Sequence, residues 1–319
     1  MAESAAKNTF LDIVNLRDDF PYGPAADEYY QLFLPHDDQP HGYMLPGIVE
    51  KMPWSSAFAV SHHKPRKVEL VDIPDDHSTA DAITKAFQDL IDICIERDLF
   101  HVLCKRHSEL ISVVSATYNS GSIKIERFAA SLFGLTCRGA HLVAYSSALD
   151  GTIDSIWIPR RSAHLYTHPS MLDTTVAGGV KAGVAPFQII VEEADEEASL
   201  PEELVRRLAV SRGVISHMAT TGKGFPGEQG LAVPDYVYVY DMALPSDIEP
   251  RPHDDEVTAF YPMSVNEVKT ALLNEEFKPD SGAVLIDFLI RHGIITAEDE
   301  RDFVEISMRL HRRLPFRLG

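Results

Sequence analysis

The chain has 319 residues, of which 45% are hydrophobic and 24% are charged, and its formal net charge at pH 7 is -19. This composition supplies enough apolar side chains for a sizeable core in one large domain or two smaller ones. The negative charge argues against a general nucleic-acid or anionic-membrane binder, because the long-range field repels both.

Cysteine usage and hydropathy indicate the compartment. Cys94, Cys104 and Cys137 form an odd, sparse set without CxxC spacing, which fits a reducing environment and no disulfide framework. No window approaches the roughly 18 apolar residues that a membrane span needs. We therefore expect a cytoplasmic protein without membrane or nucleic-acid partners, a monomer or homodimer that acts on a small molecule.

The N-terminal third predicts a mixture of strands and one long helix. Residues 1–75 are rich in proline and turn residues, and the short apolar runs between them favour strands. Residues 77–100 carry apolar side chains at helical spacing. The composition changes near 135–140, so we predict one domain over residues 1–135 and a second over 136–319.

The second part predicts strands followed by helices. Two alternating apolar runs joined by a turn at Asp150-Gly151 indicate a strand pair. The clearest strand is "DYVYVYDMAL", where β-branched and aromatic residues alternate strictly. Helices are predicted for residues 201–213, 264–277, 282–293 and 296–314.

The stretch "VEEADEEASL", residues 191–200, concentrates acidic side chains on a predicted helix that ends near Ser199. Since each helical residue advances about 100°, Glu193, Glu196 and Glu197 share an arc of about 100°. Like charges at these spacings destabilise a helix by a few tenths of a kcal/mol per pair. Clustered carboxylates suit Mg²⁺ or Mn²⁺, whereas the charge run alone favours a solvated acidic face.

Residues 178–200 resemble the Nudix box, a loop–helix–loop metal site. Gly178 takes its first position, and Glu193, Glu196 and Glu197 take the positions of the three helical glutamates. The resemblance implies that these glutamates are catalytic, hold divalent metal ions on a diphosphate linkage, and help to activate the attacking water.

The wider sequence looks like the Nudix proteins related to thiamine pyrophosphokinase, found in fungi and plants. Segments such as "SIWIPRRS" and "THPSMLDTTVAGGV" carry the likeness, which is strong from about residue 125. It implies an α/β/α sandwich with a mixed sheet between helices, preceded by a smaller α/β domain. The implied activity is hydrolysis of a diphosphate, with thiamine diphosphate or its damaged analogues as typical substrates.

The resemblance also suggests further site residues. Arg160 and Arg161 are candidates for substrate phosphate contacts, with solvent-facing charges at a strand end as the alternative. Glu256 is a candidate for an additional metal ligand, with a surface loop as the alternative. Gly178, Gly179 and Tyr236 complete the predicted substrate-binding set.

Five positions depart from the family pattern. Val184 replaces a box glutamate, Glu192 replaces the box arginine, and Ser199 replaces the box glycine. Leu165 and Ser170 stand where relatives usually carry lysine and glycine. The exchange of arginine for glutamate removes a guanidinium that orients the helical glutamates.

Two functional hypotheses follow, and a third class remains open. The first is a metal-dependent Nudix hydrolase acting on a small organic diphosphate. The second is a repurposed Nudix-fold enzyme whose carboxylates perform acid–base chemistry, such as isomerisation, cyclisation or epoxide opening, on a metabolite without diphosphate cleavage. The third is a binding or regulatory protein without catalytic activity.

Overall fold

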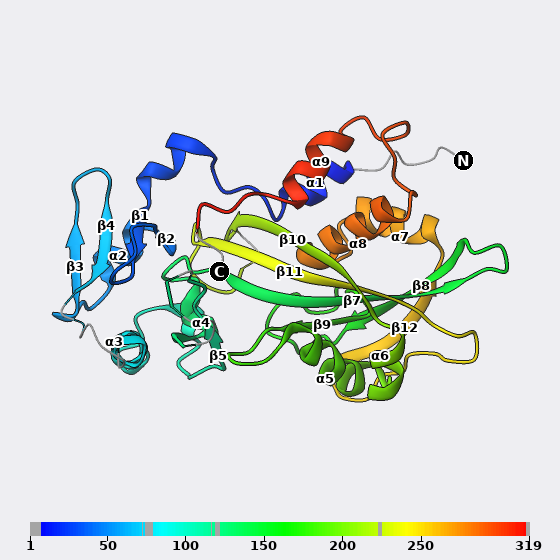
Figure 1. Ribbon diagram of the computed structural model, residues 1–319, viewed down its shortest axis with the longest axis horizontal. Coiled ribbons are helices and arrows are strands. Elements are labelled where there is room, and N and C mark those ends of the chain that lie inside the picture. Colours follow the sequence, from blue (N-terminus) through cyan, green and yellow to red (C-terminus); the bar gives the residue numbers. More distant parts are fainter. Residues whose placement is uncertain are drawn as a thin grey trace.

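The computed structural model describes residues 8–71, 73, 79–115, 117–118, 122–222 and 225–316. Figure 1 shows a smaller group of elements from the N-terminal third beside a larger group built on a long mixed sheet. No helix within these ranges has the length and apolar character needed to cross a membrane.

The smaller group contains a sheet with strand order β2-β1-β4-β3 and the separate strand pair β5-β6. β1 and β4 run parallel, and the other neighbours in the first sheet are antiparallel. The elements of this group are the 3₁₀ helix η1 (Gly23–Glu28), β1 (Tyr30–Phe33), β2 (Gly42–Met44), α2 (Pro46–Lys51), β3 (Phe58–Ser61), β4 (Lys67–Leu70), α3 (Thr79–Glu96), η2 (His101–Leu103), β5 (Leu110–Ser112), β6 (Lys124–Glu126) and α4 (Arg127–Ala130).

The local predictions for this part hold over its described residues. The apolar runs of residues 1–75 form strands as expected, although they are joined by short helices that the sequence did not indicate. α3 confirms the predicted long helix, and its buried residues recur at helical spacing because they face the core beneath the small sheet. These buried residues include Ile83, Ala86, Phe87, Leu90, Ile91 and Cys94.

The larger group is built on a sheet with strand order β10-β11-β7-β8-β12, to which β9 adds by pairing with β7. β11 and β7 run parallel, whereas the other pairs are antiparallel, so the sheet is mixed. The elements are α1 (Phe10–Asn15), β7 (Cys137–Ser147), β8 (Ile153–Arg161), β9 (Val176–Gly179), α5 (Pro186–Ala198), α6 (Glu202–Leu208), β10 (Val210–Thr220), β11 (Ala232–Ala243), β12 (Val257–Met263), α7 (Val265–Leu273), α8 (Pro279–Arg291) and α9 (Phe303–Leu310).

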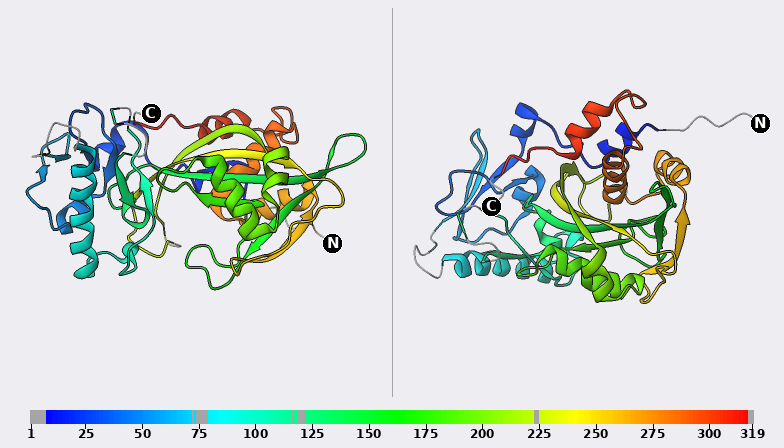
Figure 2. Two further views of the ribbon diagram at one scale, coloured as in Figure 1. Left: turned by 60° about the horizontal axis from the view of Figure 1, so that its bottom comes forward. Right: turned by 45° about the vertical axis from the view of Figure 1, so that its right-hand side comes forward.

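Helices cover both faces of the large sheet. α5 and α6 lie on one face, and α1, α7, α8 and α9 lie on the other, as both views of Figure 2 show. The predicted α/β sandwich with a mixed sheet between helices is therefore confirmed. The predicted strand pair around Asp150-Gly151 is also confirmed, since β7 and β8 are antiparallel on either side of this turn.

Strand β7 divides the two cores of the sandwich. Ala140, Leu142 and Ala144 point to the core shared with α5, while Val143 points to the core shared with α8. Successive side chains of a strand point to opposite faces, so this strand contributes apolar groups to both sides. The sequence of a strand that is buried on both faces is a continuous run of apolar residues, as "LVA" at 142–144 is.

A separate apolar core lies within the smaller group. It consists of buried residues between positions 30 and 135, together with Leu231 from the larger group. Helix α1, by contrast, packs its Phe10, Ile13 and Val14 against α7, α8 and α9. The division of the chain at residue 135 stays a prediction.

The helices predicted over residues 264–277 and 282–293 correspond to α7 and α8 with shifted bounds, and the other two are much shorter than predicted. The helix predicted over residues 201–213 ends at Leu208, because Val210 already pairs with Asp241 of β11 and Gly213 has a φ of 109°. The helix predicted over residues 296–314 is confined to α9. It ends before His311, where the chain forms a bridge with Ser216 of β10.

A buried carboxylate ties α8 to the sheet. Asp241 of β11 is 1% exposed and accepts hydrogen bonds from Arg291 at 2.5 and 3.0 Å, from Arg212 at 3.1 Å and from His292 at 3.0 Å. Burial opposes the ionisation of Asp241, but its hydrogen bonds with His292 and Arg291 outweigh this effect, and its pKa lies below its usual range.

We expect Asp241→Asn to lower the free energy of unfolding at pH 7 by about 2–4 kcal/mol, because it removes the buried charge that Arg212, Arg291 and His292 all contact. The contribution of a carboxylate with a lowered pKa is present above its unfolded pKa near 3.9 and is lost as the pH falls through the folded value. The difference between wild type and variant should therefore shrink below about pH 4.

Urea unfolding at several pH values measures this difference. Glu305→Gln is the control, because Glu305 pairs with Arg309 on the exposed side of α9, and such pairs contribute less than about 1 kcal/mol. Equal stability of Asp241→Asn and wild type at pH 7 would contradict the assignment.

Candidate functional site

Helix α5 carries the predicted glutamates. It begins at Pro186, a residue suited to the first helical turn, and ends at Ala198, after which Ser199 has a φ of 53°. Ile189, Ile190 and Ala194 anchor it against the large sheet. The predicted acidic helix and its end are thereby confirmed.

The three glutamates differ in their surroundings. Glu197 is 7% exposed, Glu193 is half-buried and Glu196 is exposed. The backbone N–H of Ala177, on β9, donates a hydrogen bond to Glu197 Oε2 at 3.4 Å. One side of the helix therefore presents carboxylates at the edge of the sheet where β9 lies.

Gly178 allows α5 to approach β9 closely. A Cβ atom at this position would lie 2.6 Å from Ile189 Cγ2, 2.7 Å from Glu193 Cγ and 2.8 Å from Glu193 Oε1. Real Cβ atoms do not tolerate such contacts, so a side chain here would displace the helix or Glu193. The close approach of α5 to β9 therefore explains why the first position of the predicted box is a glycine.

A loop before β12 brings Glu256 to the same region. The backbone N–H groups of Arg251 and Asp254 donate to the carbonyl oxygens of Ala198 at 3.0 Å and Glu196 at 3.1 Å. These bonds satisfy carbonyl groups at the C-terminal end of α5 and dock the loop there. Glu256 acts electrostatically on both Glu193 and Glu197.

The buried carboxylates resist ionisation. Burial raises the pKa of Glu193 to about 7, helped by Glu196, Glu256 and Glu192 and opposed by Lys181. Burial and the neighbouring Glu193 raise the pKa of Glu197 well above its ordinary value. Clustered carboxylates with so few hydrogen-bond donors have the oxygen chemistry that suits a hard divalent cation.

The glutamates are not drawn together as a preformed metal cage. Within the described part of the chain, one group of potential metal ligands has all its ligand atoms within 4.8 Å of one another. It consists of Asp92, His107 and Glu126. Glu126 there already accepts hydrogen bonds from Gln88 at 2.7 Å and from the Ser108 N–H at 2.9 Å, and it contacts His107 Nδ1 at 2.6 Å. Those contacts account for that group without an ion.

The two predicted phosphate-binding arginines have structural contacts. Arg160 Nη1 donates to the Ser170 carbonyl oxygen at 2.8 Å. Arg161 donates to the carbonyl oxygens of His168 and Thr167, both at 3.3 Å, and to Asp173 Oδ2 at 3.0 Å. Both side chains hold the loop that follows β8, and their role in substrate binding stays a prediction.

Gly179 and Tyr236 occupy different positions. Gly179 lies next to Gly178 on β9, where an added Cβ would meet nothing closer than Arg127 Cδ at 3.9 Å. Tyr236 is on β11 and packs edge-to-face against Tyr238, with ring centroids 5.5 Å apart. Burial raises its pKa. The structure does not place Tyr236 in contact with the helical glutamates, and its binding role stays a prediction.

The departures from the Nudix pattern have local explanations. Val184 packs against the core beneath α5. Glu192 accepts a hydrogen bond from Gln188 at 3.1 Å. Ser170 and Ser199 both have positive φ values, 61° and 53°, and therefore keep a backbone conformation that favours glycine. Leu165 is half-buried in the loop after β8.

Sequence reasoning missed two charged neighbours of the glutamates. Lys181 lies between the box glycines and α5, and its charge favours ionised Glu193. Asp173 precedes β9 and disfavours ionised Glu197. The proximity of Lys181 could have been anticipated from its place in the box, and it supplies a cation near a site whose arginine position holds Glu192.

The chain is similar in sequence to proteins from yeast and a plant. The chain is 37% identical over 198 residues to the uncharacterized protein YJR142W of Saccharomyces cerevisiae, covering 61% of this chain and 58% of that protein. It is 31% identical over 231 residues to Nudix hydrolase 20, chloroplastic, of Arabidopsis thaliana, covering 72% of this chain and 58% of that protein. The chain thus spans less than two thirds of either relative.

No protein-family model matches the chain. The crystal structure of DR0079 from Deinococcus radiodurans aligns with 64% of this chain and all of its own, at 17% identity and a TM-score of 0.38.

We expect Gly178→Ala to lower the free energy of unfolding by about 1–3 kcal/mol, because overpacking forces α5 or Glu193 to move. Gly179→Ala is the matched control, since its new methyl group meets only ordinary contacts. Urea unfolding of both variants measures the difference. An equal loss in the two variants would refute the proposed steric role of Gly178.

Proposed function

We propose that this chain, a member of the Nudix superfamily, is a metal-dependent hydrolase that cleaves the diphosphate linkage of a small organic diphosphate. The observation that carries the proposal is the gathering of Glu193, Glu196, Glu197 and Glu256 at one edge of the sheet. The sequence relationship to a named Nudix hydrolase supports the same reaction class.

The chain's own residues would hold and orient Mg²⁺ or Mn²⁺. Glu193, Glu196 and Glu197 would be the ligands from α5, and Glu256 the ligand from the opposing loop. A divalent cation bound there supplies charge stabilisation for phosphate oxygens and a water of lowered pKa. The Ala177 N–H fixes the orientation of Glu197, and Gly178 sets the distance of Glu193 from β9.

A thiamine diphosphate-like compound is the first substrate to test, because of the resemblance noted in the sequence. Lys181 provides a cation beside the glutamates that favours binding of an anionic substrate. We place the protein in the cytoplasm and treat residues 1–135 as a separate domain, in line with the sequence predictions.

Hydrolysis should be visible in a ³¹P NMR time course with thiamine diphosphate, ADP-ribose, nucleoside diphosphates and prenyl diphosphates, each with Mg²⁺, Mn²⁺ or chelator. We expect a monophosphate product that requires the metal. Glu197→Gln should lower the rate at least about a hundredfold, the scale on which loss of a group acting in the chemical step is felt.

Asp195→Asn is the control for Glu197→Gln, because Asp195 is an exposed residue of the same helix outside the carboxylate group. Cleavage that is unaffected by chelator, or by Glu197→Gln, would overturn the metal-dependent mechanism. No cleavage of any compound by folded protein would instead favour acid–base chemistry on a metabolite without a diphosphate.

Glu192→Arg tests whether the missing box arginine limits the reaction. The substitution replaces an anion that disfavours ionised Glu193 with a cation that favours it. We expect the hydrolysis rate to be preserved or raised, as measured by the same NMR assay. A loss of rate with an unchanged melting temperature would show that Glu192 has its own role in turnover.

A further inference from the structure

The segment that leads into β9 changes its partner strand as it crosses the large sheet. At the start of this segment, Leu172 forms a bridge with Arg160 of β8, and the Asp173 N–H donates to the Pro159 carbonyl oxygen at 3.1 Å. From Val176 onward the segment pairs with β7 instead. The two residues between Asp173 and Val176 therefore lie where the chain leaves one strand and joins another.

Strand β7 changes its partner at the same place. The last of its residues that pairs with β9 is Leu142, and the first that pairs with β8 is Tyr145. Continued by one residue, the antiparallel register with β8 would set Ala144 opposite Trp157. In the structure, the hydroxyl group of Thr175 stands between the backbone groups of these two residues.

Thr175 joins the three strands through this one hydroxyl group. The Ala144 N–H donates to Thr175 Oγ1 at 2.8 Å, and the hydroxyl donates in turn to the Trp157 carbonyl oxygen at 2.7 Å. Because Thr175 is completely buried, its side chain and not bulk water satisfies these two backbone groups. The hydroxyl thus replaces a direct bond between β7 and β8 at the point where β9 enters the sheet.

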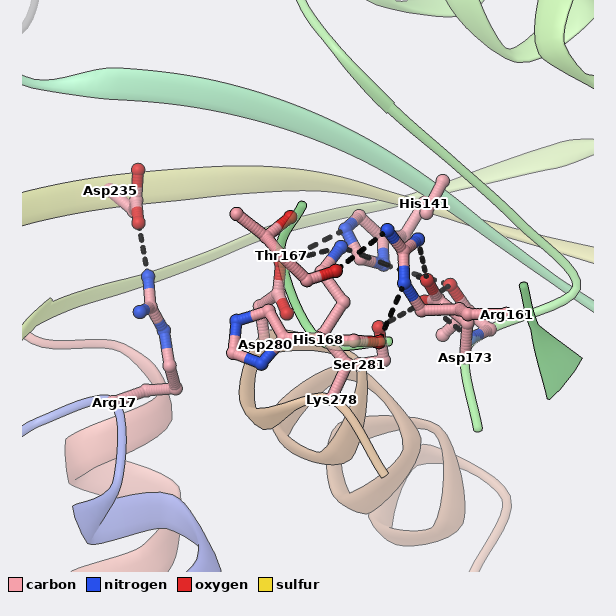
Figure 3. A network of polar contacts seen from close by, with 12 residues as sticks. Arg17, His141, Arg161, Thr167, His168, Asp173, Asp235, Lys278, Asp280 and Ser281 are labelled. Atoms are coloured by element: carbon pink, nitrogen blue, oxygen red, sulfur yellow. Dashed lines mark hydrogen bonds and ion pairs between the residues drawn. The ribbon is translucent and has the colours of Figure 1, made fainter. Parts of the chain in front are cut away.

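A network of polar contacts on the α8 face lies beside this junction. Figure 3 shows the network, which includes the ion pair of Arg17 with Asp235 and the side chains of Asp173 and Asp280. Lys278 Nζ lies 3.8 Å from Asp173 Oδ2 and 3.1 Å from Asp280 Oδ2. The network thereby ties the start of α8 to the segment before β9.

The residues that precede Thr175 are fixed by contacts of their own. Asp173 accepts hydrogen bonds from Arg161 of β8 at 3.0 Å and from the Ser281 hydroxyl of α8. Thr174 Oγ1 lies 2.8 Å from Nδ1 of His141, on β7. The chain therefore reaches Thr175 from a fixed direction, and the Thr175 hydroxyl sets where it continues.

The same stretch of chain supports the carboxylates of α5. Thr175 lies two residues before Ala177, whose N–H donates to Glu197 Oε2 at 3.4 Å. Gly178 follows, and its missing side chain leaves room for Glu193. Because an extended strand allows little freedom over two or three residues, the point where β9 enters the sheet sets the distance between β9 and α5.

We propose that Thr175 is a positioning residue for the carboxylates of α5, because its hydroxyl fixes the entry of β9 and thereby the contact of Ala177 with Glu197. Its effect on turnover rests on the proposed hydrolase function, whereas the contact itself exists without a metal ion. Groups that orient metal ligands from outside typically contribute about ten- to a hundredfold in metal affinity or activity. Loss of the hydroxyl should therefore be felt at the glutamates.

The test compares two substitutions at Thr175 with a matched control. Thr175→Val removes the hydroxyl and keeps the shape of the side chain, whereas Thr175→Ser keeps the hydroxyl. Thr221→Val is the control, because the Thr221 hydroxyl also accepts from a backbone N–H, that of Leu231 at 2.9 Å, and donates to a carbonyl oxygen, that of Glu228 at 2.7 Å. Thr221 is likewise buried, but it lies between β10 and β11.

The first measurement is made on the metal-free protein. Hydrogen exchange of the Ala177 amide, followed by NMR, reports on its bond with Glu197. We expect exchange about tenfold faster in Thr175→Val, because the loss of a buried hydrogen-bonded group favours local opening. Exchange should stay at the wild-type rate in Thr175→Ser and in Thr221→Val, although urea unfolding should show similar destabilisation in the two valine variants.

The second measurement concerns the metal ion. Binding of Mn²⁺ to folded protein, followed by electron paramagnetic resonance, should weaken about tenfold in Thr175→Val. The kcat for diphosphate cleavage should fall with it. Thr175→Ser should restore both values, and Thr221→Val should change neither.

Three results would overturn the proposal. The first is equal effects of Thr221→Val and Thr175→Val on Ala177 exchange and Mn²⁺ binding, because general destabilisation would then explain both. The second is wild-type exchange in folded Thr175→Val, and the third is a failure of Thr175→Ser to restore it. If Thr175→Val does not fold, Thr175→Ala removes the same hydroxyl with less crowding and carries the test.

Failure of the hydrolase function would be recognised separately. It would appear as wild-type protein that neither binds Mn²⁺ nor cleaves any diphosphate. Exchange of the Ala177 amide in the same variants then decides the role of Thr175 by itself, since this measurement needs neither metal ion nor substrate.

Discussion

The pairing of β7 with three other strands is the constraint that places the carboxylates of α5 beside β9 and His141 on the opposite face of the sheet. β11 runs parallel to one edge of β7, and β8 and β9 share its other edge in succession. Among the described strands β9 pairs with β7 alone, so its other edge is unpaired, and the Ala177 N–H donates to Glu197. The odd-numbered residues of the same strand meanwhile bring His141 to the opposite face.

The protein stabilises its internal carboxylates in two ways. On the α8 face, cations and hydroxyl groups are supplied by the chain itself, as at Asp173 and Asp241. At the edge beside α5, Glu193 and Glu197 gain little such compensation and their pKa values are raised. Buried anions left without internal partners are costly, which is typical of sites that act on something from outside.

The sequence predicted the elements whose patterns are local. The helical arc of Glu193, Glu196 and Glu197 follows from 3.6 residues per turn, and the alternation in β11 follows from the two-residue period of a strand. It could not predict that residues 210–213 leave the helix, because that depends on the ladder with β11. Likewise, Arg17, Asp235 and Asp280 meet only through tertiary packing across more than 200 positions, and no local pattern marks them.

Asp173 links the network on the α8 face to the carboxylates of α5. It binds Arg161 and Ser281 on the α8 face, and its charge also acts on Glu197. If the glutamates hold a cation, a change in the charge around Asp173 would change their affinity for it. By reciprocity, the cation would change the strength of the contacts that Asp173 makes with Arg161 and Ser281, so charge at the edge beside α5 would be felt on the opposite face without any movement of the backbone.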